Sequence, residues 1–321
     1  MERVRREPVE RVGRRCDHFA PADAGGRGAQ NVPSGPVRVD RNGERRFGGH
    51  SLILLRWAHM PAAPLESARR AILSSSSNPL VKSVRQAVRR GGLTEGGLAL
   101  LESPHLLDEA IAAKLPVEMI LVSESSKFLE DLVRSKLPLR VLSDKLFSEV
   151  ASTESSQGVV ALVRLEPTPL EEILARPGPI VALDAVQDPG NAGTIVRSAE
   201  AFGAAGIVFL KGCASPFNPK TMRASAGSLL RLPFASNLPP GRIAGISGRA
   251  ILAADAGGDP LSEVPLDDVI LAIGSEAHGV GPAIGLAARP VAVPTQGVES
   301  LNAAAAAAVI LYEAARRKAA K

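Results

Sequence analysis

The chain has 321 residues, of which 45% are hydrophobic and only 3% aromatic, so Ala, Val, Leu and Ile supply enough core for two globular domains. The net charge of +5 is unevenly spread: residues 1–70 hold 14 arginines and 8 acidic residues, whereas the remainder holds 24 Lys and Arg and 25 Asp and Glu. The longest apolar runs are shorter than the roughly 20 residues that a membrane-spanning helix requires, which argues against a membrane protein.

Cysteine and histidine usage argues against metal and disulfide chemistry. The two cysteines, Cys16 and Cys213, cannot form a disulfide framework or a cysteine metal site, and the five histidines show no metal-ligand spacing. We therefore expect no metal, and the cysteine usage fits a reducing, cytoplasmic location.

Residues 1–70 are rich in Arg, Gly and Pro and have no sustained periodicity, which predicts a disordered basic extension. This segment is an RNA-grasping arm, a targeting peptide, or translated sequence upstream of the true start, because Met60 directly precedes the organised part. We favour the last interpretation. Its eight acidic residues argue against an organelle transit peptide, and it has no apolar region followed by a cleavage site, as a signal peptide would.

A helix start at residues 74–79 (SSSSNP) opens the first domain, and apolar positions 80, 81, 84 and 88 predict an amphipathic helix. The other face of that helix carries four cations, Lys82, Arg85, Arg89 and Arg90. This basic face is either a solvated surface or a phosphate-contacting one, and the sequence does not choose between them. Strand-like and helical patterns then alternate, which predicts an α/β domain over residues 71–165.

Proline-bearing residues 166–177 predict a linker to a second domain over residues 178–321. In that domain, short Val/Ile/Leu runs separated by helical segments predict a buried parallel sheet. Ligands of such sheets bind at the carboxyl ends of the strands. Three loops at those ends carry unusual polar residues.

The first loop is residues 188–197 (DPGNAGTIVR), which contains neither a dinucleotide fingerprint nor a P-loop. Gly190 and Gly193 permit a tight turn there. Asn191 could cap the following helix, and Arg197, taken alone, would be a solvated helix residue.

The second loop is residues 273–279 (IGSEAHG), and the third is residues 293–302, before an alanine-rich helix. Gly274 lets a ligand approach the backbone. Glu276 could hold an arginine or accept hydrogen bonds, and it is equally an acid favoured at a helix start. In the third loop Ser300 and Asn302 also fit helix capping, and the small residues of the helix favour close packing.

Taken together and in this order, N-x-G-x-x-x-R, G-S-E-x-x-G and P-x-x-x-x-x-S-L-N resemble the three motifs of the SpoU (TrmH-like) RNA ribose 2′-O-methyltransferases of the SPOUT superfamily. The resemblance covers about residues 180–315, and residues 72–165 resemble the family's small substrate-binding domain of ribosomal-protein L30e type. It implies a C-terminal trefoil knot, an exception to the rule that chains avoid knots. It also implies S-adenosylmethionine as the cofactor and a homodimer whose site draws on both subunits.

The resemblance assigns roles to eight residues. Those implied to line the cofactor are Gly274, Val293 and Leu301. Those implied to surround the ribose are Asn191, Arg197, Glu276, Ser300 and Asn302. Because a guanidinium stays protonated, we expect Arg197 to bind the phosphate beside the target and to stabilise the developing alkoxide.

The small domain favours ribosomal RNA over transfer RNA as the substrate, by family analogy alone. A transfer RNA 2′-O-methyltransferase and a non-catalytic RNA-binding protein on the same scaffold remain the alternatives. A nucleotide-binding oxidoreductase is disfavoured because the fingerprint is missing.

Overall fold

The computed structural model describes residues 37–39, 45–47, 72–135, 137–246 and 248–320. The chain divides into two units, Met1–Gly49 and His50–Lys321. In the first unit β1 (Val37–Val39) and β2 (Arg45–Phe47) pair as antiparallel strands. The sequence did not predict this pairing. The other predictions for residues 1–70 are disorder and the three interpretations of the segment as an RNA-grasping arm, a targeting peptide or translated upstream sequence. They concern residues outside those that the structure describes.

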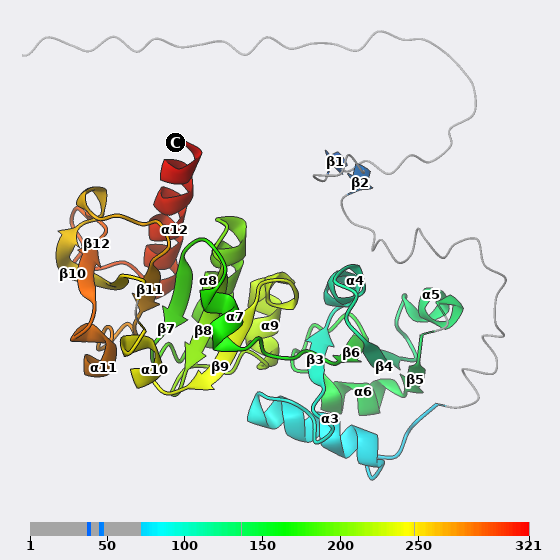
Figure 1. Ribbon diagram of the computed structural model, residues 1–321. Coiled ribbons are helices and arrows are strands. Elements are labelled where there is room, and N and C mark those ends of the chain that lie inside the picture. The colour runs from blue at the N-terminus through cyan, green and yellow to red at the C-terminus, as the bar shows by residue number, and fades with distance from the viewer. Residues whose placement is uncertain (1–36, 40–44, 48–71, 136, 247, 321) are drawn as a thin grey trace, which may run out of the picture. The chain divides into compact units, whose positions relative to one another are not determined.

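The first sheet of the second unit has four strands in the order β3-β6-β4-β5 (Figure 1). Its strands are β3 (Ala99–Glu102), β4 (Val117–Ser123), β5 (Leu139–Leu142) and β6 (Val159–Val163). Strand β6 pairs antiparallel with β3 and β4, and β4 pairs parallel with β5. The alternating α/β pattern predicted from the sequence is confirmed here.

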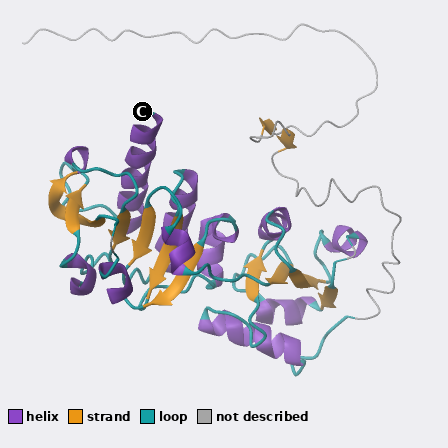
Figure 2. Cartoon of the chain, viewed as in Figure 1, coloured by secondary structure: helices purple, strands orange, loops and turns teal. Residues whose placement is uncertain are grey.

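Two pairs of helices cover this sheet (Figure 2). Helices α3 (Pro79–Arg90) and α6 (Asp144–Val150) share one buried cluster, whereas α4 (Pro104–Ala112) and α5 (Leu129–Arg134) contribute to another. Helix α3 begins where the Asn78 side chain accepts a hydrogen bond from Leu80 N, and it ends at Gly91, whose φ of 61° suits glycine. The predicted amphipathic helix is therefore confirmed.

The second sheet has six strands in the order β12-β10-β11-β7-β8-β9, and every pairing is parallel. Its strands are β7 (Ile180–Leu183), β8 (Gly206–Leu210), β9 (Phe234–Leu238), β10 (Ile251–Pro260), β11 (Ile270–Ile273) and β12 (Arg289–Ala292). Strands β7, β8 and β11 are buried at every position. The predicted buried parallel sheet is confirmed, although β9 was missed.

Helices pack on both faces of this sheet or lie at its ends. They are α7 (Leu170–Leu174), α8 (Pro189–Ala201), α9 (Pro219–Ser225), α10 (Gly241–Ala244), α11 (Pro282–Gly285) and α12 (Ala303–Ala319), with short 3-10 turns η1 (Ser228–Leu230) and η2 (Leu261–Glu263). Helix α12 packs along α8 and buries Ala303, Ala304 and Ala307. The small residues of α12 therefore pack closely, as predicted.

Gly193 lies inside α8 and sets a close helix contact. A Cβ there would stand 2.5 Å from the carbonyl oxygen of Thr221 and 2.6 Å from Cβ of Ala224 on α9. The prediction of a tight turn at this position is wrong, because Gly193 lies within α8. The glycine is needed for the close approach of α9.

Ion pairs connect the small sheet's elements with the helices of the large one. Glu102 at the end of β3 is buried and accepts a hydrogen bond from Arg223 of α9 at 2.9 Å. Arg231 contacts both Glu109 of α4 and, at 2.6 Å, Glu200 of α8. Glu102 is the buried member of these pairs, and loss of Arg223 would leave its charge uncompensated, so this contact favours one arrangement of the two domains.

Candidate functional site

Asn191 joins the three polar loops. The Asp188 side chain caps α8 and accepts a hydrogen bond from Asn191 N at 2.8 Å, which holds Asn191 in the first helical turn. The Asn191 amide nitrogen donates to Glu276, and its amide oxygen accepts from Asn302 at 3.3 Å. Glu276 and Asn302, which are 85 and 111 positions from Asn191 in the chain, therefore both contact this one side chain.

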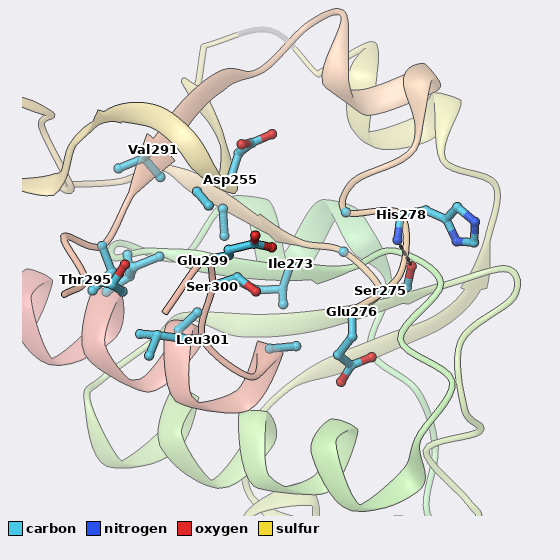
Figure 3. A pocket seen from close by; sticks show the side chains of 18 residues that line it. Asp255, Ile273, Ser275, Glu276, His278, Val291, Thr295, Glu299, Ser300 and Leu301 are labelled. Atoms are coloured by element: carbon cyan, nitrogen blue, oxygen red, sulfur yellow. Dashed lines mark hydrogen bonds between the residues drawn. The ribbon is translucent and has the colours of Figure 1, made fainter. Parts of the chain in front are cut away.

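Glu276 stands on a narrow turn after β11. Ser275 N donates to Gly279 O at 3.1 Å and Gly279 N donates to Ser275 O at 2.9 Å. The Ser275 hydroxyl accepts from His278 N at 3.2 Å (Figure 3). This hydrogen-bonded turn fixes the backbone that carries Glu276.

Gly274, which precedes this turn, is needed by the chain itself. A Cβ there would stand 1.9 Å from the carbonyl carbon of Gly279 and 2.3 Å from the nitrogen of Val280. No real Cβ contact is that short, so the returning backbone excludes any side chain at this position. Access for a ligand, which the sequence suggested as the reason for the glycine, stays a separate prediction.

Asn302 is the N-cap of α12. Its side-chain oxygen accepts from Ala304 N at 2.9 Å and Ala305 N at 3.3 Å. The capping interpretation of Asn302 is therefore confirmed, and the same side chain uses its nitrogen to reach Asn191. One residue starts the helix and ties it to α8.

A cavity of about 340 Å³ lies where the middle of β10 and the chain segments after β11 and β12 meet α12 (Figure 3). Five of the residues singled out in the sequence line it: Gly274, Glu276, Val293, Ser300 and Leu301. The cavity wall also contains residues that the sequence did not single out, among them Asp255, His278 and Thr295. Asp255 directly follows an apolar strand run, the same signal that identified the other loops, and could have been found in that way.

The cavity combines an apolar wall with carboxylates. Ile273, Val291 and Ile310 form part of its surface, and Asp255, Glu276 and Glu299 bring three acidic side chains, with no lysine or arginine among its described lining residues. Unpaired acidic groups attract positive charge. The arrangement suits a small molecule that has an apolar part and a cationic one.

Arg197 is the one residue of the predicted eight that is placed outside this cluster. It is exposed on α8, six residues after Asn191, which corresponds to about 9 Å along the helix axis. It does not line the cavity, and its guanidinium has no hydrogen-bond or ion-pair partner within the described part of the chain. The side chain is thus available to a molecule that approaches from solvent.

Two titratable groups near the site have shifted pKa values. Lys220 donates to Asp188 at 3.0 Å and, together with the Asn191 backbone amide, holds the pKa of the Asp188 carboxyl below its ordinary value. Burial raises the pKa of the Cys213 thiol, which keeps it protonated near neutral pH. The cap of α8 stays ionised, whereas Cys213 is a poor nucleophile.

Among the described residues, no group of three or more His, Cys, Asp or Glu side chains could hold a metal ion. No helix in that part of the chain is long and apolar enough to cross a membrane.

Two family models match the chain. Residues 178–312 match the SpoU rRNA Methylase family, and residues 78–161 match the MRM3-like substrate binding domain. Among curated proteins, the chain is similar to the 23S rRNA (guanosine(2553)-2'-O)-methyltransferase RlmP of Bacillus subtilis, at 32% identity over 75% of this chain and 97% of that protein. It is also similar to the 23S rRNA (uridine(2479)-2'-O)-methyltransferase of Streptomyces viridochromogenes, at 31% identity over 71% of this chain and 86% of that one.

The chain is also similar to solved structures of RNA methyltransferases. The SpoU methyltransferase AviRb from Streptomyces viridochromogenes, in complex with the cofactor AdoMet, superposes with a TM-score of 0.66 and 29% identity, over 75% of this chain and 98% of that chain. An AdoMet-bound rRNA methyltransferase from Sinorhizobium meliloti superposes with a TM-score of 0.66 and 27% identity, over 76% and 97% of the two chains.

Proposed function

We propose that this chain, which belongs to the SpoU rRNA methylase family, transfers a methyl group from S-adenosylmethionine to the 2′-hydroxyl of a ribose in ribosomal RNA. The observation that supports this most is the contact of Asn191 with Glu276 and Asn302 beside the cavity. It places the three motif loops around one point. The 23S rRNA named for two relatives favours ribosomal over transfer RNA.

The cavity fits the proposed cofactor. Its volume of about 340 Å³ falls within the roughly 300–1,000 Å³ of small-molecule sites. Its apolar wall suits an adenosine moiety, and its carboxylates suit a sulfonium or an ammonium group. Residues Gly274, Val293 and Leu301 would hold the cofactor. When bound, S-adenosylmethionine supplies an electrophilic methyl group.

The protein's own task is then to align the ribose oxygen and to manage its proton, which requires no covalent nucleophile. In the proposed mechanism Ser300 and Asn302 position the ribose. Glu276 and Asn191 hold the Asn302 side chain in place through the hydrogen bonds that join the three residues. Arg197 binds the phosphate beside the target and stabilises the negative charge that develops on the 2′-oxygen. Its exposed, unpaired guanidinium supports a role on the RNA side of the site.

We further propose that the enzyme is a homodimer whose site draws on both subunits. Helix α12 exposes Val309 and Tyr312, and the Tyr312 ring contacts Phe202 at the end of α8 with centroids 5.7 Å apart. Contiguous exposed apolar patches mark interaction sites, and Val309 and Tyr312, three positions apart, are neighbours on the surface of α12. Because Arg197 lies outside its own chain's cavity, pairing of two copies gives it a second cavity on which to act.

In this proposal residues 71–165 form the RNA substrate-binding domain, residues 166–177 the linker and residues 178–321 the methyltransferase domain. Membership of the SpoU family supports a trefoil knot in the last part of the chain. The enzyme would act in the cytoplasm, where its RNA substrate is found.

A methyl-transfer assay tests the proposed function. The protein is incubated with S-adenosylmethionine labelled in its methyl group, together with either ribosomal or transfer RNA from cells that lack this protein. We expect label in alkali-resistant 2′-O-methylated nucleotides of ribosomal RNA. Label confined to transfer RNA would show that the substrate is transfer RNA and not ribosomal RNA. RNA binding without any transfer of label would favour the non-catalytic alternative.

A further inference from the structure

Helix α3 presents a row of cations away from the core. Val81, Val84 and Ala87 are buried against the small sheet. The remaining face carries Lys82, Arg85, Arg89 and Arg90, which we call the α3 basic row. From its first to its last residue the row extends about 12 Å along the helix axis. Two hollows of about 380 and 450 Å³ lie along it.

Two of these four charges are free to bind an anion. Arg85 is paired with Glu149 at 2.8 Å. Arg90 donates to Gln86 at 2.6 Å when the Gln86 amide takes the orientation that its neighbours favour, and the same amide then donates to Glu95. Lys82 and Arg89 are exposed and have no hydrogen-bond or ion-pair partner among the residues that the structure describes. They lie seven positions apart, and therefore on the same side of the helix.

Direct contacts lead from the α3 basic row to the site. Gly91 ends α3 so close to α9 that a Cβ on it would stand 2.6 Å from the Asn218 side chain. Asn218 caps α9, and two residues later Lys220 reaches Asp188 at 3.0 Å. Asp188 in turn caps α8, because its side chain accepts a hydrogen bond from Asn191 N. The end of α3 thus lies beside the start of α9, whose first turn contacts the cap of the helix that carries Asn191.

We propose that Lys82 and Arg89 of the α3 basic row bind the phosphates of the RNA strand next to the nucleotide held at Asn191 and Glu276. This inference rests on the proposed function. A polyanionic backbone complements two unpaired cations on one side of a helix, and contacts of this kind supply affinity and register without reading the bases. Lys82 and Arg89 therefore set how RNA is held along the small domain, whereas the choice of nucleotide is made elsewhere.

The test compares two double variants that remove equal charge from opposite sides of the small domain. Lys82→Ala with Arg89→Ala removes the two free cations of the row. The matched control, Lys114→Ala with Lys127→Ala, removes two exposed lysines beside α4 and α5, which cover the other face of the sheet. Affinity for a full-length 23S rRNA transcript is measured over a range of salt concentrations, and calorimetry with S-adenosylmethionine checks that each variant is folded.

Loss of two phosphate contacts should lower the slope of log affinity against log salt by about 1.4 and weaken binding about tenfold or more at about 0.1 M salt. The KM for RNA should rise while kcat is unchanged, because these contacts hold ground state and transition state equally. The control should match the wild type. A wild-type slope in the Lys82/Arg89 variant, or an equal loss in the control, would overturn the inference. Failure of the wild-type protein to methylate any RNA would instead refute the proposed function.

Discussion

Replacement of Gly274 by alanine tests whether the turn after β11 has room for a side chain. The new Cβ would stand 1.9 Å from the Gly279 carbonyl carbon, whereas ordinary contacts begin at 3.4 Å. The turn that carries Glu276 must therefore move by about 1.5 Å. Overpacking of this kind costs about 1–3 kcal/mol, which corresponds to a fall in Tm of about 2–12 °C for a protein of this size.

Thermal unfolding without ligand, followed by calorimetric titration with S-adenosylmethionine, measures both consequences. We expect a lower Tm and an affinity at least about tenfold weaker, equivalent to about 1.4 kcal/mol. Gly241→Ala is the matched control, because nothing lies within 4 Å of its added Cβ, and its Tm should be unchanged or slightly raised. A wild-type Tm and affinity in Gly274→Ala would refute the geometric reasoning. Weaker binding with a wild-type Tm would show that the glycine serves the ligand alone.

Three further predictions concern α8 and α12. Arg197→Ala should lower kcat by about 100-fold or more without changing S-adenosylmethionine affinity, and a wild-type single-turnover rate would remove its assigned role. Tyr312→Asp should place a charge in the proposed dimer interface and yield monomers in sedimentation, so an unchanged mass would contradict that interface. Hydrogen bonds from Arg316 and then Arg317 lower the pKa of Glu313 from 4.5 to about 2. Such a depressed pKa stabilises the fold above pH 4.5, and the contribution is lost as the pH falls towards 2. The Tm advantage of the wild type over Glu313→Gln should therefore shrink across that window, and a constant difference would argue against it.

Much of the fold could be predicted from local patterns, because the central strands of its sheets are buried on both faces. β7, β8 and β11 are short continuous apolar runs bounded by turn residues, which is how central parallel strands appear. β9 was missed because Ser236 and Asn237 interrupt it and prolines flank it, and Asn237 has a φ of 60°. Strand β9 forms because it pairs with β8, and a local sequence pattern contains no information about that neighbouring strand.

The site was predictable as a set of loops, whereas its contacts were not. Strand ends and the resemblance pointed to Asn191, Glu276 and Asn302, but which of them touch depends on the meeting of segments 85 and 111 residues apart. The reason for Gly274 is a backbone contact that only the folded turn creates. The separation of Arg197 from the cavity follows from the helical geometry of α8. In the proposed function another molecule, RNA or a second copy of the chain, completes the site at Arg197, and the sequence of one chain contains no local pattern for that contact.

The most direct test of the central claim is a crystal structure of the protein with S-adenosylhomocysteine, the demethylated product of the cofactor. The account predicts that this ligand lies in the cavity against Gly274, Val293 and Leu301, with its sulfur towards the cluster of Asn191, Glu276 and Asn302. Density for the ligand in another place, such as the serine-lined hollow of the small domain around Ser125 and Ser148, with the cavity beside α12 empty, would contradict it.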